Sequence, residues 1–266
     1  MYLEHWKLNL FPFENTADER FFFESKAHST LHEDLQDAVL RRKGAIALTG
    51  GIGCGKTTIT QRLLLNLPED RFDIALINYP CLTSIEMLFE ICQQLGLNAN
   101  KDDRSSMLHA LQKHLINNAE TGRDTLVCID EAQSIPSLET FEELRLLLNF
   151  QLGGRFLMSL LFVGQPELER KIAEIPQLQQ RIALHVNLQK MQTQDTTRYI
   201  LHRLRTAGCT QPILTRQAVE KIYQHTTGIP RRINHLMDRC LLVGMRENAS
   251  LLDGKLVETT MQRYPC

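Results

Sequence analysis

The sequence predicts an α/β fold in which a parallel five-stranded sheet is flanked by helices and is followed by a small all-α domain. Two observations lead to this fold class. From residue 44 onward, short runs that are apolar along their whole length alternate with helical patterns, as expected for strands covered on both faces of a sheet. After about residue 190 only helical patterns follow. We therefore expect an N-terminal linker segment at 1–43, an α/β domain at 44–190 and a helical lid domain at 191–266.

The strands are expected at five β-rich apolar runs: 45–50, 73–80, 125–131, 156–165 and 183–189. The helices of the second domain are expected at 193–208, 215–228, 230–248 and 253–262, where several patterns open with Thr, Asp or Pro and two end at Gly. The longest apolar run, 156–164, has about half the length that a bilayer span needs. It predicts a buried strand, and we expect no membrane span.

Composition places the chain among ordinary globular proteins. Of its 266 residues, 43% are hydrophobic and 23% are charged, which excludes a disordered or a fibrous chain. The first fifteen residues carry charges and a proline where a signal peptide would be continuously apolar. The seven cysteines show neither a CxxC pair nor a zinc-like spacing. These features predict a cytoplasmic protein with reduced thiols.

Charge is unevenly distributed along the chain. The net charge is −1, yet residues 181–246 hold eleven Lys and Arg against three Asp and Glu. We expect this basic region to face something anionic, which can be nucleotide phosphates, an acidic neighbouring subunit or nucleic acid.

A phosphate-binding loop is predicted at 50–57, where the sequence fits G-x-x-x-x-G-K-[ST] between an expected strand and an expected helix. Backbone amides of such a loop and the positive end of the following helix bind phosphate oxygens. Lys56 would reach the β and γ phosphates, the Thr57 hydroxyl would coordinate Mg²⁺, and Thr58 would lie near the α-phosphate. The expected nucleotide-binding residues here are Gly50, Gly51, Ile52, Gly53, Cys54, Gly55, Lys56, Thr57 and Thr58.

Two adjacent carboxylates follow the apolar run at 126–129. Ligands gather at the carboxyl ends of parallel strands, so Asp130 and Glu131 are expected to meet the phosphate loop. Asp130 suits the Mg²⁺ shell, and Glu131 suits the orientation and deprotonation of an attacking water. A strand at 73–80 comes between the two motifs in the sequence, and no N-K-x-D guanine motif is present. Together with Glu131, this favours ATP as the cofactor over GTP.

Gln165 ends the next expected strand, between Gly164 and Pro166. It is the candidate sensor of the γ-phosphate. A Gly-Gln-Pro turn is a weak signal by itself, so a purely structural turn glutamine is the alternative.

Five motifs occur in order along the chain: GGIGCGKTT, IDEAQ, LLFVGQPELERKI, LQQRIALHVNL and GIPRRINHLMDRCL. The segment at 1–35, which precedes them, also resembles the amino-terminal segment of the family named next. On these residues the chain resembles the AAA+ ATPases of the ExeA/GspA-like (MshM-type) secretion and pilus-assembly family, with their P-loop NTPase fold. The resemblance implies that Arg181 in LQQRI is an arginine finger that reaches the γ-phosphate held by a neighbouring subunit. It implies that Arg231 in GIPRRI is a sensor arginine on a lid helix, with Arg232 as the substitute. Gly51 and Cys54 depart from the family pattern in the phosphate loop.

The same resemblance implies a cytoplasmic ATPase that assembles with itself into a ring or filament. It would couple ATP turnover to the assembly of a secretion or pilus-type envelope machine, whose components would recruit it to the inner membrane. The alternative is a DNA-associated switch ATPase of the transposition-regulator type, although the sequence contains no helix-turn-helix or zinc finger. For Phe11, Pro12 and Phe13, an adenine contact and a hydrophobic anchor under the lid are both open.

Overall fold

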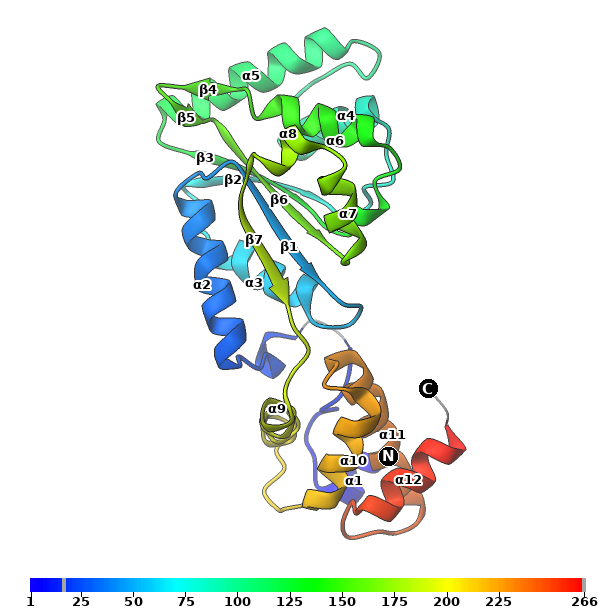
Figure 1. The fold of residues 1–266 in the computed structure, drawn as a ribbon. Helices are drawn as coiled ribbons and strands as arrows, with labels where there is room; N and C mark the ends of the chain where they lie inside the picture. The colour runs from blue at the N-terminus through cyan, green and yellow to red at the C-terminus, as the bar shows by residue number, and fades with distance from the viewer. Residues whose placement is uncertain (16–17, 265–266) are drawn as a thin grey trace. The chain divides into compact units, whose positions relative to one another are not determined.

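The computed structural model describes residues 1–15 and 18–264, so the last two residues of the expected lid domain, including Cys266, lie outside the described residues. The chain divides into two units (Figure 1). The α/β unit comprises His28–Ile52 and Lys56–Leu188, and the helical unit comprises Met1–Ala27, Gly53–Gly55 and Gln189–Cys266.

The α/β unit contains a parallel sheet of five strands in the order β2-β3-β6-β1-β7. The strands are β1 (Ala45–Gly50), β2 (Phe72–Ile77), β3 (Asp124–Ile129), β6 (Met158–Gly164) and β7 (Ile182–Leu188). The predicted five-stranded parallel sheet is thereby confirmed. Although β2 comes between the two nucleotide motifs in the sequence, it lies at one side of the sheet, and β6 is the strand that separates β1 from β3.

Helices cover both faces of this sheet, with α2 and α3 on one face and α4 to α8 on the other (Figure 1). Their bounds are α2 (Lys26–Leu40), α3 (Lys56–Asn66), α4 (Ser84–Gln94), α5 (Arg104–Glu120), α6 (Leu138–Leu147), α7 (Glu167–Ala173) and α8 (Pro176–Gln179). Every residue of β1, β3 and β6 is buried. Side chains of a strand alternate between the two faces, so two covered faces explain why these runs are apolar at nearly every position.

A small hairpin that the sequence analysis did not predict lies between α6 and β6. Its strands β4 (Gln151–Leu152) and β5 (Arg155–Phe156) pair antiparallel. Gly153 and Gly154 form the turn with φ of 58° and 77°, as a two-residue hairpin loop requires. The predicted strand at 156–165 therefore includes the end of this hairpin.

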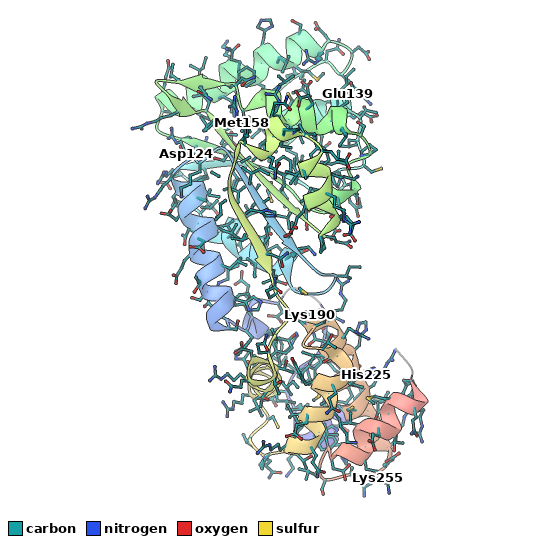
Figure 2. All side chains as sticks on the ribbon, viewed as in Figure 1. Asp124, Glu139, Met158, Lys190, His225 and Lys255 are labelled. Atoms are coloured by element: carbon teal, nitrogen blue, oxygen red, sulfur yellow. The ribbon has the colours of Figure 1, made fainter. Side chains whose placement is uncertain are left out.

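All strands of the sheet run the same way, so the sheet has an amino edge, where the strands begin, and a carboxyl edge, where they end. Asp124 and Met158 mark the amino edge at the starts of β3 and β6 (Figure 2). The short 3₁₀ turn η2 (Ala132–Ser134) follows β3 at the carboxyl edge.

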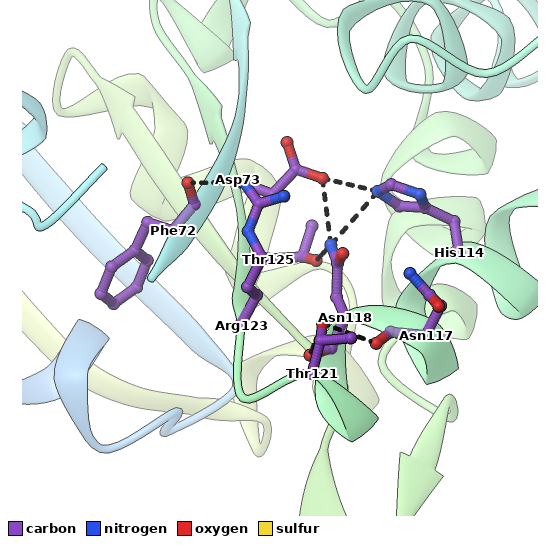
Figure 3. A network of polar contacts seen from close by, with 8 residues as sticks. All are labelled: Phe72, Asp73, His114, Asn117, Asn118, Thr121, Arg123 and Thr125. Atoms are coloured by element: carbon purple, nitrogen blue, oxygen red, sulfur yellow. Dashed lines mark hydrogen bonds and ion pairs between the residues drawn. The ribbon is translucent and has the colours of Figure 1, made fainter. Parts of the chain in front are cut away.

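A polar network near the amino edge ties α5 to β2 and β3 (Figure 3). Nε2 of His114 lies 2.5 Å from Oδ2 of Asp73, and the amide of Asn118 donates to Asp73 and to Oγ1 of Thr125, each at 3.0 Å. Asn118 is only 2% exposed. Its buried amide is therefore satisfied by side chains rather than by water.

The helical unit contains the helices predicted after residue 190, together with two short elements from the amino end. The elements are α1 (Tyr2–Trp6), η1 (Glu19–Phe21), α9 (Thr193–Thr206), α10 (Arg216–Thr226), α11 (Pro230–Arg246) and α12 (Gly254–Arg263). Thr215 and Asp253 cap the amino ends of α10 and α12 by accepting backbone N–H groups, which explains where these helices begin.

The amino-terminal helix α1 is part of the core of the helical unit. The Tyr2 hydroxyl donates to Asp238 at 2.5 Å, and Nε1 of Trp6 donates to the carbonyl of Leu241 at 2.8 Å. Burial, together with the Asp238 carboxylate, raises the pKa of Tyr2 well above its usual value. Both side chains thus dock α1 onto α11.

The segment after α1 is held by a buried arginine of α9. Arg203 is 6% exposed and donates to the carbonyls of Pro12 and Glu14, at 2.5 and 2.9 Å. Its guanidinium lies 6.0 Å from the ring of Phe13, which is 2% exposed. Of the two alternatives for Phe13, the structure shows the hydrophobic anchor within the helical unit.

None of the six cysteines in the described part of the chain forms a disulfide bond. Within residues 1–15 and 18–264, none of the helices combines the length and the apolar character that crossing a bilayer takes.

Candidate nucleotide-binding site

The phosphate loop connects the end of β1 to the start of α3. β1 ends at Gly50 and α3 begins at Lys56, so the motif has the strand and helix context that its function needs. Gly55, the last residue before α3, has a φ of 102°, which a residue with a side chain rarely adopts, and a Cβ there would meet no atom within 4 Å. The loop therefore leads directly into the positive, amino-terminal end of α3, and the space beside Gly55 is free of other atoms.

Lys56 and Thr57 lie at the first turn of α3. Nζ of Lys56 is 2.9 Å from the carbonyl oxygen of Gly50 and 3.2 Å from that of Gly51, so the ammonium lies within its own loop. Thr57 and Thr58 are exposed. The Thr57 hydroxyl donates to Oδ2 of Asp130 at 3.1 Å and so joins the two motifs, which are 73 residues apart.

The two carboxylates directly follow β3, as predicted. The other oxygen of Asp130 accepts the backbone N–H of Glu131 at 2.9 Å. Glu131 has a left-handed backbone, with φ 51° and ψ 36°. Such a conformation is uncommon for a residue other than glycine and often marks a functional position.

Gln165 follows β6, between β1 and β3 in the sheet, and its amide donates to Oε2 of Glu131 at 3.3 Å. The structure thus brings Gln165 to Glu131, and the role of Gln165 as a sensor of the γ-phosphate stays a prediction.

Gln133 is a site residue that the sequence analysis missed. Its amide Nε2 donates to the same oxygen of Glu131 at 2.5 Å, and its Oε1 accepts the backbone N–H of Gln165 at 3.0 Å. Lys171 of α7 donates to the backbone carbonyls of Gln133 and Ile135, at 2.7 and 2.6 Å. The sequence gives no signal for this role, because only the turn η2 brings Gln133 back to Glu131, two residues before it.

A second polar cluster lies at the carboxyl edge, beside the phosphate loop. The hydroxyl of Thr49 donates to Glu169 of α7 at 2.6 Å, and the amide of Asn187 donates to the same carboxylate at 3.2 Å. The hydrogen bond from Thr49 lowers the pKa of Glu169. This cluster fixes α7 to β1 and β7.

The thiol of Cys128 lies near the Asp130 carboxylate but is not a reactive group. Cys128 precedes Asp130 by two residues in β3 and is fully buried, and its burial raises the pKa of the thiol far above its usual value.

The residues at the carboxyl edge are of the chemical types that bind Mg²⁺ and a nucleoside triphosphate. The hydroxyl of Thr57 and the carboxylate of Asp130 are oxygen ligands of the kind that Mg²⁺ prefers, and they already lie within hydrogen-bonding distance of each other.

Arg181 lies at the opposite edge of the sheet. It directly precedes β7, whose Ile182 is in register with Ala45, whereas Leu188 is in register with Gly50. The five residue steps from Ala45 to Gly50, at about 3.3 Å each, span roughly 17 Å along the strand direction. Arg181 lies one residue farther from the phosphate loop than this span. The structure does not bring Arg181 to the site of its own copy.

Arg231 is exposed in the first turn of α11, next to the exposed Arg232. Both arginines belong to the helical unit, and the sensor role of Arg231 stays a prediction.

Sequence comparisons give one family and one relative. Residues 39–172 match the family described as AAA domain. The chain is 35% identical over 246 residues to the general secretion pathway protein A of Aeromonas hydrophila, a match that covers 91% of this chain. It spans only 44% of that protein's length.

Solved structures share the fold at low sequence identity. The Aeropyrum pernix ORC2 protein, in ADPNP and ADP complexes, is 18% identical with a TM-score of 0.65, covering 92% of this chain and 71% of its own. Drosophila ORC bound to DNA is 15% identical with a TM-score of 0.66, covering 92% and 64%. The Thermotoga maritima RuvB Holliday junction branch migration motor is 18% identical with a TM-score of 0.58, covering 96% and 73%. These similarities show the fold.

Proposed function

The chain belongs to the AAA domain family, and on that premise we propose that it binds Mg·ATP at the carboxyl edge of its sheet and hydrolyses it in a self-assembled ring or filament. Thr57 and Asp130 would hold Mg²⁺, which neutralises charge on the phosphates when it is bound. Glu131 would deprotonate the attacking water, and Gln165 would contact the γ-phosphate. Lys56 and the loop amides would hold the triphosphate.

One observation carries this proposal. Thr57, Asp130, Glu131 and Gln165 come from three separate segments, and hydrogen bonds link them into two pairs at the same edge of the sheet. Such a constellation next to a phosphate loop is what water attack on a γ-phosphate needs.

The arginine at the other edge supports the assembly part of the proposal. Arg181 lies too far from its own phosphate loop to contact a γ-phosphate there, so a finger role requires a neighbouring copy. A head-to-tail arrangement would bring the amino edge of one copy to the carboxyl edge of the next.

Mixing two inactive variants tests this arrangement. Lys56→Ala protein would keep Arg181 but bind ATP poorly, and Arg181→Ala protein would bind ATP but lend no finger. Each variant alone should release little phosphate, and the mixture should recover activity. Full turnover by the dilute, monomeric wild-type protein would contradict the proposal.

The purpose of the turnover is proposed from the relative. Similarity to a general secretion pathway protein supports a role in assembling a secretion or pilus-type envelope machine, with its components as partners. The ATPase would then be cytoplasmic and recruited to the inner membrane by such a partner. Deletion of the gene should impair secretion or pilus assembly, and a Lys56→Ala copy should fail to restore it. Unimpaired envelope assembly in the deletion strain would refute this coupling.

The excess of basic residues at 181–246 favours a second candidate, a DNA-associated switch ATPase. A gel-shift assay with long duplex DNA, with and without ATP at low salt, separates the two. ATP-dependent retardation of the DNA that weakens steeply with salt would favour the DNA-associated ATPase, and absence of binding would exclude it.

A further inference from the structure

The guanidinium group of Arg181 is held from three directions by uncharged groups. Nη2 donates to the side-chain oxygen of Asn149 at 2.9 Å, and Nη1 donates to the carbonyl of Leu148 at 3.4 Å. The guanidinium carbon lies 5.8 Å from the centre of the Phe156 ring. An arginine over a ring within about 6 Å is attracted to its face.

The ring of Phe156 and the backbone of Arg181 are themselves fixed to the start of β1. A Cβ on Gly44 would lie 3.0 Å from the Phe156 ring, so this glycine lets the ring pack directly on the backbone. The N–H of Ala45 donates to the carbonyl of Arg181 at 3.3 Å. The guanidinium of Arg181, through Phe156, and the backbone of Arg181 are thus both held at the start of β1.

The neighbouring arginines at the amino edge have a different kind of partner. Arg42 and Arg71 both form ion pairs with the carboxylate of Asp124, which is 3% exposed. Among the ion pairs of the described residues, none involves Arg181. The positive charge of Arg181 is therefore oriented without being neutralised, which suits an arginine that must bind an anion from elsewhere.

All three contacts come from one continuous segment, 148–156, which leaves α6 and forms the β4–β5 hairpin. The N–H of Leu157 donates to the carbonyl of Phe150 at 3.0 Å and closes the base of this segment. The chain then enters β6, which ends next to Gln165 at the opposite edge.

We propose that Asn149 and Phe156 are positioning residues that hold the Arg181 guanidinium, with its charge available, for the triphosphate bound by a neighbouring copy. This inference rests on the proposed role of Arg181 in a neighbouring site. Fixing a long, flexible side chain before docking lowers the entropy lost when it engages its anion. A neutral amide can do this without competing with the phosphate for the charge.

Mixed assemblies test the proposal, with Arg181→Ala protein as the acceptor of the finger. The donors are the full chain carrying Lys56→Ala alone or combined with Asn149→Ala, Asn149→Asp or Phe156→Leu. The matched control combines Lys56→Ala with Asn117→Ala, which removes an exposed asparagine of α5. Thermal unfolding of each donor verifies that it folds.

The Asn149→Ala donor should lower the recovered kcat about fivefold, as expected for one exposed hydrogen bond to a charged group, without changing the KM for ATP. Phe156→Leu should also lower the recovered kcat. Asn149→Asp should lower it further, because the new carboxylate pairs with Arg181 and competes with the phosphate. The Asn117→Ala donor should match its parent.

Equal recovery from all folded donors would overturn the positioning role while leaving the finger role intact. Higher recovery with Asn149→Asp than with Asn149→Ala would also overturn it, because charge availability would then be irrelevant. A Lys56→Ala donor that fails to restore any activity would overturn the finger role and this inference together.

Discussion

The two edges of the same sheet carry opposite chemistry. At the carboxyl edge, the acidic, hydroxyl and amide side chains that would surround the γ-phosphate contact one another within one copy, as in Thr57 with Asp130 and Glu131 with Gln133. At the amino edge, an oriented arginine, Arg181, faces uncharged partners only. On the proposed roles, the carboxyl edge would hold Mg·ATP and activate the attacking water, and the amino edge would supply a positive charge that stabilises the phosphoryl-transfer transition state.

If Arg181 acts as proposed, the direction of the strands would divide the catalytic groups between copies. Strands of six or seven residues separate the two edges of the sheet by more than the reach of an arginine. No side-chain rearrangement within the α/β unit closes that distance. The following substitutions alter one edge at a time.

The largest effect is expected at the carboxyl edge. Glu131→Gln removes the proposed base and should lower turnover by about a thousandfold, because general-base catalysis contributes factors of this order. ATP binding, measured with a fluorescent analogue, should persist. Glu167→Gln, an exposed glutamate of α7, is the control and should behave as wild type. Unchanged phosphate release in Glu131→Gln would rule out the assigned role.

A conservative change at the amino edge should have the next largest effect. Arg181→Lys keeps the charge but loses the planar fork and the stacking on Phe156, so we expect a roughly thirtyfold lower kcat with unchanged ATP affinity. Steady-state phosphate release at high protein concentration measures it. If lysine supported wild-type turnover, a point charge would suffice and the oriented guanidinium would be unnecessary.

Gln133 tests whether the contacts within the carboxyl edge matter for turnover. Gln133→Leu keeps the side-chain size but removes the hydrogen bonds to Glu131 and Gln165, and kcat should fall about tenfold through the loss of their orientation. Gln179→Leu, at an exposed position of α8, is the control. A reduced ATP affinity with normal kcat would instead assign Gln133 to ground-state binding.

The polar network of α5 lies near the amino edge, and its hydrogen bonds do not involve Arg181 (Figure 3). Asn118→Ala leaves Asp73 and Thr125 without this donor, and the free energy of unfolding should fall by about 1–3 kcal/mol. Turnover per folded molecule should not change. Denaturant unfolding measures the loss, with Asn117→Ala as the control, and a matching loss of kcat would mean that the whole amino edge, not Arg181 alone, serves turnover.

The smallest effect is expected outside both edges, in the helical unit. Burial lowers the pKa of His202 below its usual 6.5, with Arg203 adding to the shift and a hydrogen bond to the Phe22 backbone opposing it. The folded state thus favours the neutral ring, and its contribution to stability is present above the unfolded pKa and lost as pH falls below about 6.5. Unfolding at about pH 7.5 and about pH 5.5 should show a small destabilisation that His202→Gln reduces. An identical pH response in that variant would assign the loss to other groups.

The sequence predicted the parts of the molecule that depend on local patterns. Buried parallel strands need apolar residues on both faces, so β1, β3 and β6 were visible as continuous apolar runs, and their parallel direction foretold the meeting of Thr57 with Asp130. Gln133 was invisible because its role depends on a turn geometry that the sequence does not reveal.

Contacts between distant segments were also beyond the sequence. Tyr2 and Asp238 meet across 236 residues, and Asn149 meets Arg181 across 32, and neither pairing leaves a periodic signal. The β4–β5 hairpin was within reach, since two adjacent glycines between short runs are a hairpin signal, but its contact with Arg181 was not.

The proposed sharing of Arg181 would also set how many nucleotides an assembly can hydrolyse. If each copy lends its Arg181 to the next, the contact is heterologous, and an open chain of copies always ends in one subunit that borrows nothing. In a short open assembly, a large share of the nucleotide sites would then lack an arginine from a neighbour, whereas closure into a ring would supply one to every site. ATP turnover per subunit would therefore depend on the length and closure of the assembly, and it would rise as each subunit is added to a growing chain.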